Sequence, residues 1–142
     1  MNEMNLSRHN QRIIALQILY SLDIKNEFDI DFINEEFEKI NIARENFDLF
    51  KKNTYFKKII EGVIEHHNKL DKKIDNLAID WDLKRINTLD KNILRIALWE
   101  LDEEIPVGVA INEAVELAKE FNCKKSAAFI NGILGKSVSS SY

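Results

Sequence analysis

Hydrophobic residues recur along most of this chain at the three- and four-residue spacing of helices that bury one face, and no stretch alternates like a half-buried strand. Helices are predicted after Ser7, within 31–44, from 47 to about 67, over 70–77, from Thr88, over 107–121 and from about Ser126. Between 47 and 77 the pattern fits either one long helix or two in succession. Six or seven helices without a strand predict an all-α fold, a compact bundle arranged as two packed sub-bundles.

Residues with strong preferences for helix ends mark several boundaries. Ser7 can cap the first helix, and Thr88 can cap a later helix that carries Asp90 in its first turn, where a carboxylate meets the positive end of the helix dipole. Pro106 lies at the position where the connection to the helix predicted over 107–121 should end. Asn122 is expected to adopt the left-handed conformation that terminates a helix.

Two of the predicted helices have so few polar positions that we expect deep burial. The first helix is apolar on several sides after its first turn and a half, and the helix from Thr88 carries two adjoining apolar stripes that suit the hub of a bundle. In the last helix, Gly132 and Gly135 are expected to let a neighbouring element approach closely.

The composition supports one helical domain. A chain of 142 residues can bury a stable core without a disulfide or a metal. Its 4 glycines and 1 proline are too few for the many turns of an all-β fold. No linker divides the chain, so we expect a single domain over 1–142, with a serine-rich tail that frays from about residue 137.

Charge and cysteine content limit the possible binding partners and the cellular compartment of the protein. The net charge is −4, from 20 basic and 24 acidic residues, so any nucleic-acid binding must use a local basic patch. A single cysteine indicates a reducing compartment. No apolar stretch is long enough for a membrane span and no signal peptide is evident, so we expect a soluble, cytoplasmic protein.

Candidates for catalysis or metal binding are few. His66 and His67 are adjacent and point about 100° apart on a helix, so they cannot chelate one metal together. Cys123 has no histidine nearby in sequence to act as its base. The glycines match no phosphate-binding loop. We therefore expect no enzyme activity, no metal and no cofactor.

A binding surface remains as the functional candidate. Arg8 and Arg12 lie four residues apart on one side of the first helix, and lysines cluster before the last helix, where Phe129 sits at the edge of the apolar stripe. Cations beside an accessible ring are what single-stranded RNA binding uses, although capping arginines and a packed phenylalanine explain the same residues. The candidate RNA-binding residues are Arg8, His9, Arg12, Lys119, Lys124, Lys125 and Phe129.

Several segments carry a resemblance to a known family. Residues 93–101 read ILRIALWEL, residues 109–119 read VAINEAVELAK after Pro106, and residues 129–134 read FINGIL. Near the N-terminus, ALQILY over 15–20 follows Arg8 and Arg12. Together these segments resemble the signature of the bacterial transcription antitermination factor NusB family over essentially the full chain.

The resemblance implies a helical protein that binds the boxA element of ribosomal RNA leader transcripts as a single strand, jointly with the ribosomal protein NusE, in an antitermination complex on RNA polymerase. It implies RNA contacts at Arg8, Arg12 and Phe129, and partner contacts at Tyr20 and Asp90. Asn131 and Gly132 look like helix-packing positions rather than ligands. Family members often carry more arginines at the N-terminus, which implies weak binding of this chain to RNA alone.

Two other classes of function stay open. A helical protein–protein adaptor without sequence-specific RNA binding would use the acidic segment 26–50. NusB-like bundles also form the N-terminal part of some RNA methyltransferases, but 142 residues leave no room for a cofactor-binding domain. A homodimer of the free protein stays open.

Overall fold

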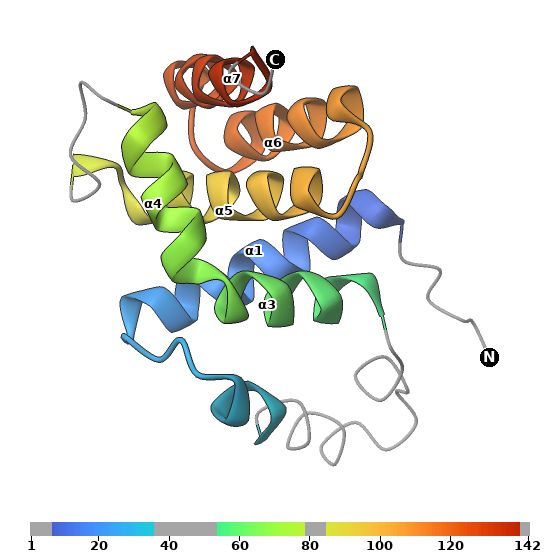
Figure 1. The fold of residues 1–142 in the computed structure, drawn as a ribbon. Helices are drawn as coiled ribbons and strands as arrows, with labels where there is room; N and C mark the ends of the chain where they lie inside the picture. Colours follow the sequence, from blue (N-terminus) through green and yellow to red (C-terminus); the bar gives the residue numbers. More distant parts are fainter. Residues whose placement is uncertain (1–6, 36–53, 79–84, 140–142) are drawn as a thin grey trace. The chain divides into compact units, whose positions relative to one another are not determined.

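The computed structural model describes residues 7–35, 54–78 and 85–139 (Figure 1). The chain divides into two compact units, residues 1–65 and 66–142. Throughout the described ranges the regular elements are helices, which confirms the predicted all-α fold. None of the helices in these ranges is long and apolar enough to cross a membrane.

The first unit is built around helix α1 (Arg8–Ile24). Ser7 caps it as predicted, because its Oγ accepts a hydrogen bond from the backbone N–H of Asn10 at 3.1 Å. Burial on several sides was predicted, but Tyr20 is 40% and Ile24 59% exposed, so this prediction is wrong for the last turns. The buried stripe of α1 comprises Arg12, Ala15, Leu16, Leu19 and Leu22.

A tight reversal follows α1 and leads into another helix. Asn26 adopts a left-handed conformation with φ of 61°, which asparagine tolerates better than most residues. Oδ1 of Asp29 then accepts from the backbone N–H groups of Asp31 at 2.8 Å and Phe32 at 3.4 Å, and residues 30–35 are helical. This segment is the start of the helix predicted within 31–44; its continuation lies outside the described residues.

Helix α3 (Tyr55–Glu65) packs side by side with α1 in the first unit (Figure 1). Its apolar spacing agrees with the prediction, and Phe56, Ile59, Ile60, Val63 and Ile64 are buried. The side-chain Oε1 of Gln11 accepts a hydrogen bond from the backbone N–H of Phe56 at 3.1 Å. A residue of α1 therefore satisfies one of the donors that the first turn of α3 leaves without an intrahelical partner.

The second unit begins with α4 (His67–Leu77). His66 departs from helical geometry, with φ of −107° and ψ of 15°, so the segment forms two successive helices rather than one. Helix α5 (Thr88–Asp102) is capped by Asn87 instead of Thr88: Asn87 Oδ1 accepts from the N–H of Asp90 at 2.8 Å. The predicted boundary is thus off by one residue, while Asp90 lies in the first turn as predicted.

Helix α5 is the hub of the second unit, as its two apolar stripes predicted. It contacts α4, α6 (Val107–Phe121) and α7 (Lys124–Ser139) (Figure 1). Helix α6 starts directly after Pro106, as predicted, and α7 starts two residues before Ser126. Fraying from about residue 137 was predicted, but 137–139 continue α7 and Ser137 is only 5% exposed; residues 140–142 lie outside the described ranges.

Two glycine predictions in α7 are wrong. A Cβ atom added at Gly132 or Gly135 would meet nothing within 4 Å, so neither position marks a close approach of another described element. Gly132 and Asn131 are both exposed, so they are not helix-packing positions within the described part of the chain either.

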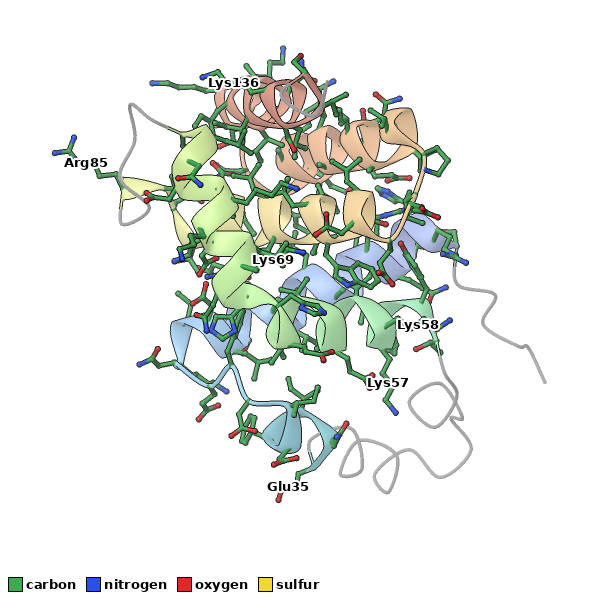
Figure 2. All side chains as sticks on the ribbon, viewed as in Figure 1. Glu35, Lys57, Lys58, Lys69, Arg85 and Lys136 are labelled. Atoms are coloured by element: carbon green, nitrogen blue, oxygen red, sulfur yellow. The ribbon has the colours of Figure 1, made fainter. Side chains whose placement is uncertain are left out.

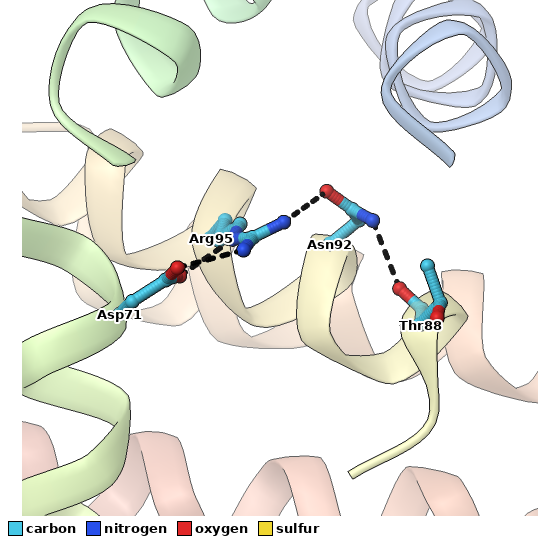
Figure 3. A network of polar contacts seen from close by, with 4 residues as sticks. All are labelled: Asp71, Thr88, Asn92 and Arg95. Carbon is cyan, nitrogen blue, oxygen red and sulfur yellow. Dashed lines mark hydrogen bonds and ion pairs between the residues drawn. The ribbon is translucent and has the colours of Figure 1, made fainter. Parts of the chain in front are cut away.

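A polar network crosses the interior of the second unit (Figure 3). Arg95 of α5 is 4% exposed, and its Nε and Nη2 donate to the two carboxylate oxygens of Asp71 of α4 at 2.6 and 2.8 Å. Its Nη1 donates to Asn92 Oδ1 at 3.1 Å, and Asn92 Nδ2 donates to the carbonyl oxygen of Thr88 at 2.9 Å. The bidentate pairing compensates a charge that burial would otherwise penalise.

Replacing Asp71 with Ala should lower the free energy of unfolding by about 2–4 kcal/mol, because it leaves the Arg95 guanidinium buried without its carboxylate. Urea denaturation measures this loss. The matched control is Lys69→Ala (Figure 2), which removes an exposed pair with Asp102 at 3.7 Å and should cost less than about 1 kcal/mol. Equal losses for the two variants would contradict the assigned role of Asp71.

Candidate nucleic-acid interface

In the first unit, the two predicted arginines meet at one aromatic ring. The guanidinium carbon of Arg8 lies 3.9 Å from the centroid of the Tyr55 ring, and that of Arg12 lies 5.6 Å from it. The prediction that both guanidinium groups lie on one side of α1 is confirmed. Tyr55 was not among the predicted residues, because it is far from Arg8 in sequence and only the packing of α3 against α1 brings it there.

The two arginines differ in how accessible they are. Arg8 is exposed, His9 is half-buried and Arg12 is only 3% exposed. No ion pair joins Arg8 to a carboxylate among the described residues. Arg8 can therefore meet an external anion directly, whereas Arg12 also contributes to packing.

The start of α1 concentrates positive charge. Its first turn contains no acidic residue, although carboxylates stabilise this end of a helix and cations destabilise it. Arg8 adds its charge to the partial positive charge of the backbone N–H groups at the same end. This arrangement disfavours the isolated helix and favours the binding of an anion.

Helix α7 of the second unit begins in the same way. Lys124 and Lys125 occupy its first two positions and are exposed, and α7 contains no acidic residue along its whole length. Phe129 follows one turn later and is half-buried, as its place at the edge of the apolar stripe predicted. Lys119 at the end of α6 differs, because it pairs with Glu116 at 3.8 Å on the surface.

The turn before α7 is tied to α5 by a side chain. The predicted left-handed conformation of Asn122 is wrong, since its φ is −132° and its ψ is −103°. Its Nδ2 instead donates to Oδ1 of Asp90 at 3.1 Å, and Oδ2 of Asp90 accepts from Asn87 Nδ2 at 3.2 Å. Asp90 is 4% exposed, so its carboxylate holds the turn from within the second unit.

Cys123 lies exposed in that same turn. Its Sγ is 3.6 Å from the Oγ of Ser126. Hydrogen bonding from the backbone N–H and the hydroxyl of Ser126 lowers the pKa of the Cys123 thiol.

Exposed apolar residues on α1 mark a separate candidate surface. Tyr20 and Ile24 lie four residues apart, so they share one face of the helix. They are 40% and 59% exposed. Tyr20 was a predicted partner contact, whereas Ile24 was not singled out because its exposure depends on how α1 packs.

The described residues form two all-helical units with cationic helix starts, and they contain no group of three or more histidine, cysteine or acidic side chains that could hold a metal ion. This is the architecture of a small helical binding protein. The NusB family model matches residues 9–139, and the chain therefore belongs to the NusB family. Members of this family are transcription antitermination factors and not enzymes.

Relatives and solved structures agree with this assignment. The transcription antitermination protein NusB of Halothermothrix orenii is 49% identical over 95% of this chain and 98% of its own length. That of Thermodesulfovibrio yellowstonii is 39% identical over 92% and 91%. T. maritima NusB superimposes with a TM-score of 0.75 at 31% identity, covering 94% of this chain and 91% of its own.

A further solved structure shares the fold. It contains the antitermination factors NusB and NusE in complex with double-stranded RNA, and the matching chain has a TM-score of 0.72 at 23% identity. The match covers 96% of this chain and 100% of that one.

Asn122→Ala should lower the free energy of unfolding by about 1 kcal/mol, because the buried carboxylate of Asp90 loses one of its donors. Asn131→Ala is the matched control, since Asn131 is exposed on α7; its effect should stay within about 0.5 kcal/mol. Urea denaturation of both variants measures the difference. A loss for Asn122→Ala no greater than the control's would show that the Asp90 contact contributes nothing to stability.

Proposed function

We propose that this chain binds single-stranded boxA RNA of ribosomal RNA leader transcripts jointly with NusE, and that the complex supports processive transcription by RNA polymerase in the cytoplasm. One observation carries the RNA-binding part: α1 and α7 both begin with exposed basic side chains and have no acidic residue in their first turns. Local cationic sites in a chain of net charge −4 are the pattern expected of a specific anion-binding surface.

Support from relatives points the same way. One chain of the solved complex of NusB and NusE with double-stranded RNA has the same fold as this chain. This chain is also 49% identical to a transcription antitermination protein. We propose that one RNA strand contacts Arg8, His9 and Arg12 in the first unit and Lys119, Lys124, Lys125 and Phe129 in the second. The cations attract phosphates, and the Phe129 ring offers a stacking face for a base.

The proposed contacts differ in strength. Lys119 already pairs with Glu116, and Arg12 is buried, so Arg8, Lys124 and Lys125 carry most of the accessible charge. Few cations imply weak binding to RNA alone and a shallow dependence on salt. NusE, bound to the same strand, adds contacts and raises the effective concentration, so affinity should rise in the ternary complex.

For the NusE surface we propose the α1 face that presents Tyr20. An apolar pair of exposed residues four apart suits the core of a protein interface, and Ile24 is the more exposed of the two. Asp90 contributes to the partner surface indirectly. Its buried carboxylate orients the exposed amides of Asn87 and Asn122. A homodimer of the free protein remains a separate proposal, measurable by sedimentation.

Replacing Lys124 and Lys125 together with Ala should weaken boxA binding and reduce the slope of log affinity against log salt by about 1.4, since each phosphate contact on a single strand contributes about 0.7. The melting temperature should not fall, because both side chains are exposed and their charges lie at the positive end of the α7 dipole. Fluorescence anisotropy from low to moderate salt measures the slope. Lys72→Ala, an exposed lysine of α4, is the control; an unchanged slope in the double variant would remove α7 from the RNA surface.

Ile24→Asp should raise the Kd for NusE by about tenfold or more, because it places a charge in the core of the proposed apolar contact. Helicity and melting temperature should be preserved, since Ile24 is 59% exposed. Calorimetric titration of purified NusE gives the Kd. Val109→Asp, at a residue 44% exposed on α6, is the control, and equal affinities for the two variants would place the NusE contact elsewhere.

The same reagents separate antitermination from the adaptor alternative. A protein–protein adaptor would bind boxA and a scrambled strand equally, with or without NusE. A boxA-specific factor binds boxA more tightly, and the preference grows when NusE is present.

A further inference from the structure

Arg8 offers a flat, charged surface that rests on the Tyr55 ring. Its guanidinium carbon is 3.9 Å from the ring centroid, well within the distance of about 6 Å at which a cation and an aromatic face attract each other. Arg8 is exposed and Tyr55 half-buried, so the ring supports the guanidinium from the protein side while the side chain stays accessible to solvent.

The chain beside the ring is anchored to α1, and a second arginine lies near the ring. Phe56, the next residue, is fully buried, and its N–H donates to Gln11 of α1 at 3.1 Å. Arg12, 3% exposed, lies 5.6 Å from the same ring. Because Tyr55 is fixed before any ligand arrives, Arg8 is partly ordered in advance and loses less side-chain entropy on binding.

A guanidinium in this setting can do more than attract a phosphate. It is planar and weakly hydrated, so it stacks on π systems with its faces while its in-plane N–H groups donate hydrogen bonds. Unpaired RNA bases stack on arginine planes as well as on aromatic rings. A lysine ammonium carries the same charge but has no face to offer.

We propose that Arg8 is a stacking platform for one unpaired nucleobase, giving a layered arrangement of base, guanidinium and Tyr55 ring, and that Tyr55 is the positioning residue that orients the platform. This inference rests on the proposed RNA-binding function and adds to it a specific contact with a base. It makes Arg8 a direct contact to an unpaired base, and not only a counter-charge to the backbone.

The decisive variant is Arg8→Lys in the full chain, because it keeps the charge and removes the plane. Binding to a fluorescent boxA oligonucleotide, in the presence of NusE, should weaken about 5- to 30-fold, the order expected for losing one stacked base. The slope of affinity against salt should stay that of the wild type, since no charge is lost. Unfolding in urea should be unchanged because Arg8 is exposed.

Abasic oligonucleotides locate the contact. Wild type and Arg8→Lys are each titrated with strands that lack one base at successive positions, which gives a double-mutant cycle for each base. At one position the abasic strand should weaken wild-type binding and leave Arg8→Lys binding nearly unaffected. Equal effects of every abasic position on both proteins would overturn the proposal.

Variants of Tyr55 test the positioning part. Tyr55→Phe keeps the ring and should bind within about twofold of the wild type, whereas Tyr55→Leu removes it and should bind like Arg8→Lys. Urea unfolding of Tyr55→Leu identifies any general loss of structure. If Tyr55→Leu proves unstable, the coupling between Arg8→Lys and one abasic position still decides whether a base stacks on Arg8.

The outcomes separate this inference from the proposed function. If Arg8→Ala binds weakly but Arg8→Lys binds within twofold of the wild type, Arg8 acts by charge alone. The proposed stacking on Arg8 is then wrong, while the proposed RNA-binding function is unaffected. If the wild type binds boxA and scrambled strands equally, boxA recognition is wrong. The abasic cycle on the scrambled strand then still shows whether a base stacks on Arg8.

Discussion

Helix α5 is buried along nearly its whole length, and the second unit is organised by the need to satisfy its polar side chains. Arg95 and Asp90 are each 4% exposed, and both side chains form hydrogen bonds to residues outside α5. Asp71 of α4 compensates Arg95, and Asn122 at the end of α6 donates to Asp90. Since unpaired buried charges are strongly destabilising, these contacts fix where α4 and the turn before α7 lie on the hub.

The same constraint connects stability to the proposed RNA-binding surface. The turn held by Asp90 leads directly into Lys124 and Lys125, so the buried carboxylate helps to order the exposed cations. In the first unit, Gln11 has a comparable role. It accepts a hydrogen bond at the start of α3 and so helps to position Tyr55, over whose ring Arg8 lies. In each unit, one hydrogen bond from a side chain of one helix to a neighbouring element thus helps to order the surroundings of a cationic helix start.

Both helix starts carry an electrostatic disadvantage. Basic residues at the positive end of a helix dipole destabilise the helix by about 0.3–1 kcal/mol each, and the first turns of α1 and α7 contain no carboxylate to offset this. Helix α5, which has Asp90 in its first turn, shows the favourable arrangement. The contrast is expected where a surface serves the binding of an anion instead of the stability of the free protein.

The sequence by itself determined the helices, the cap at Ser7, the start after Pro106 and the hub role of α5, because apolar periodicity and end preferences are local properties. It could not decide the break at His66, the conformation of Asn122, the burial of Arg12 or the open space at Gly132. The conformation of Asn122 depends on a residue distant in sequence, because Asp90 accepts a hydrogen bond from the Asn122 amide that a local rule assigned to a left-handed turn. The Tyr55 ring under Arg8 likewise exists only because α1 and α3 pack together.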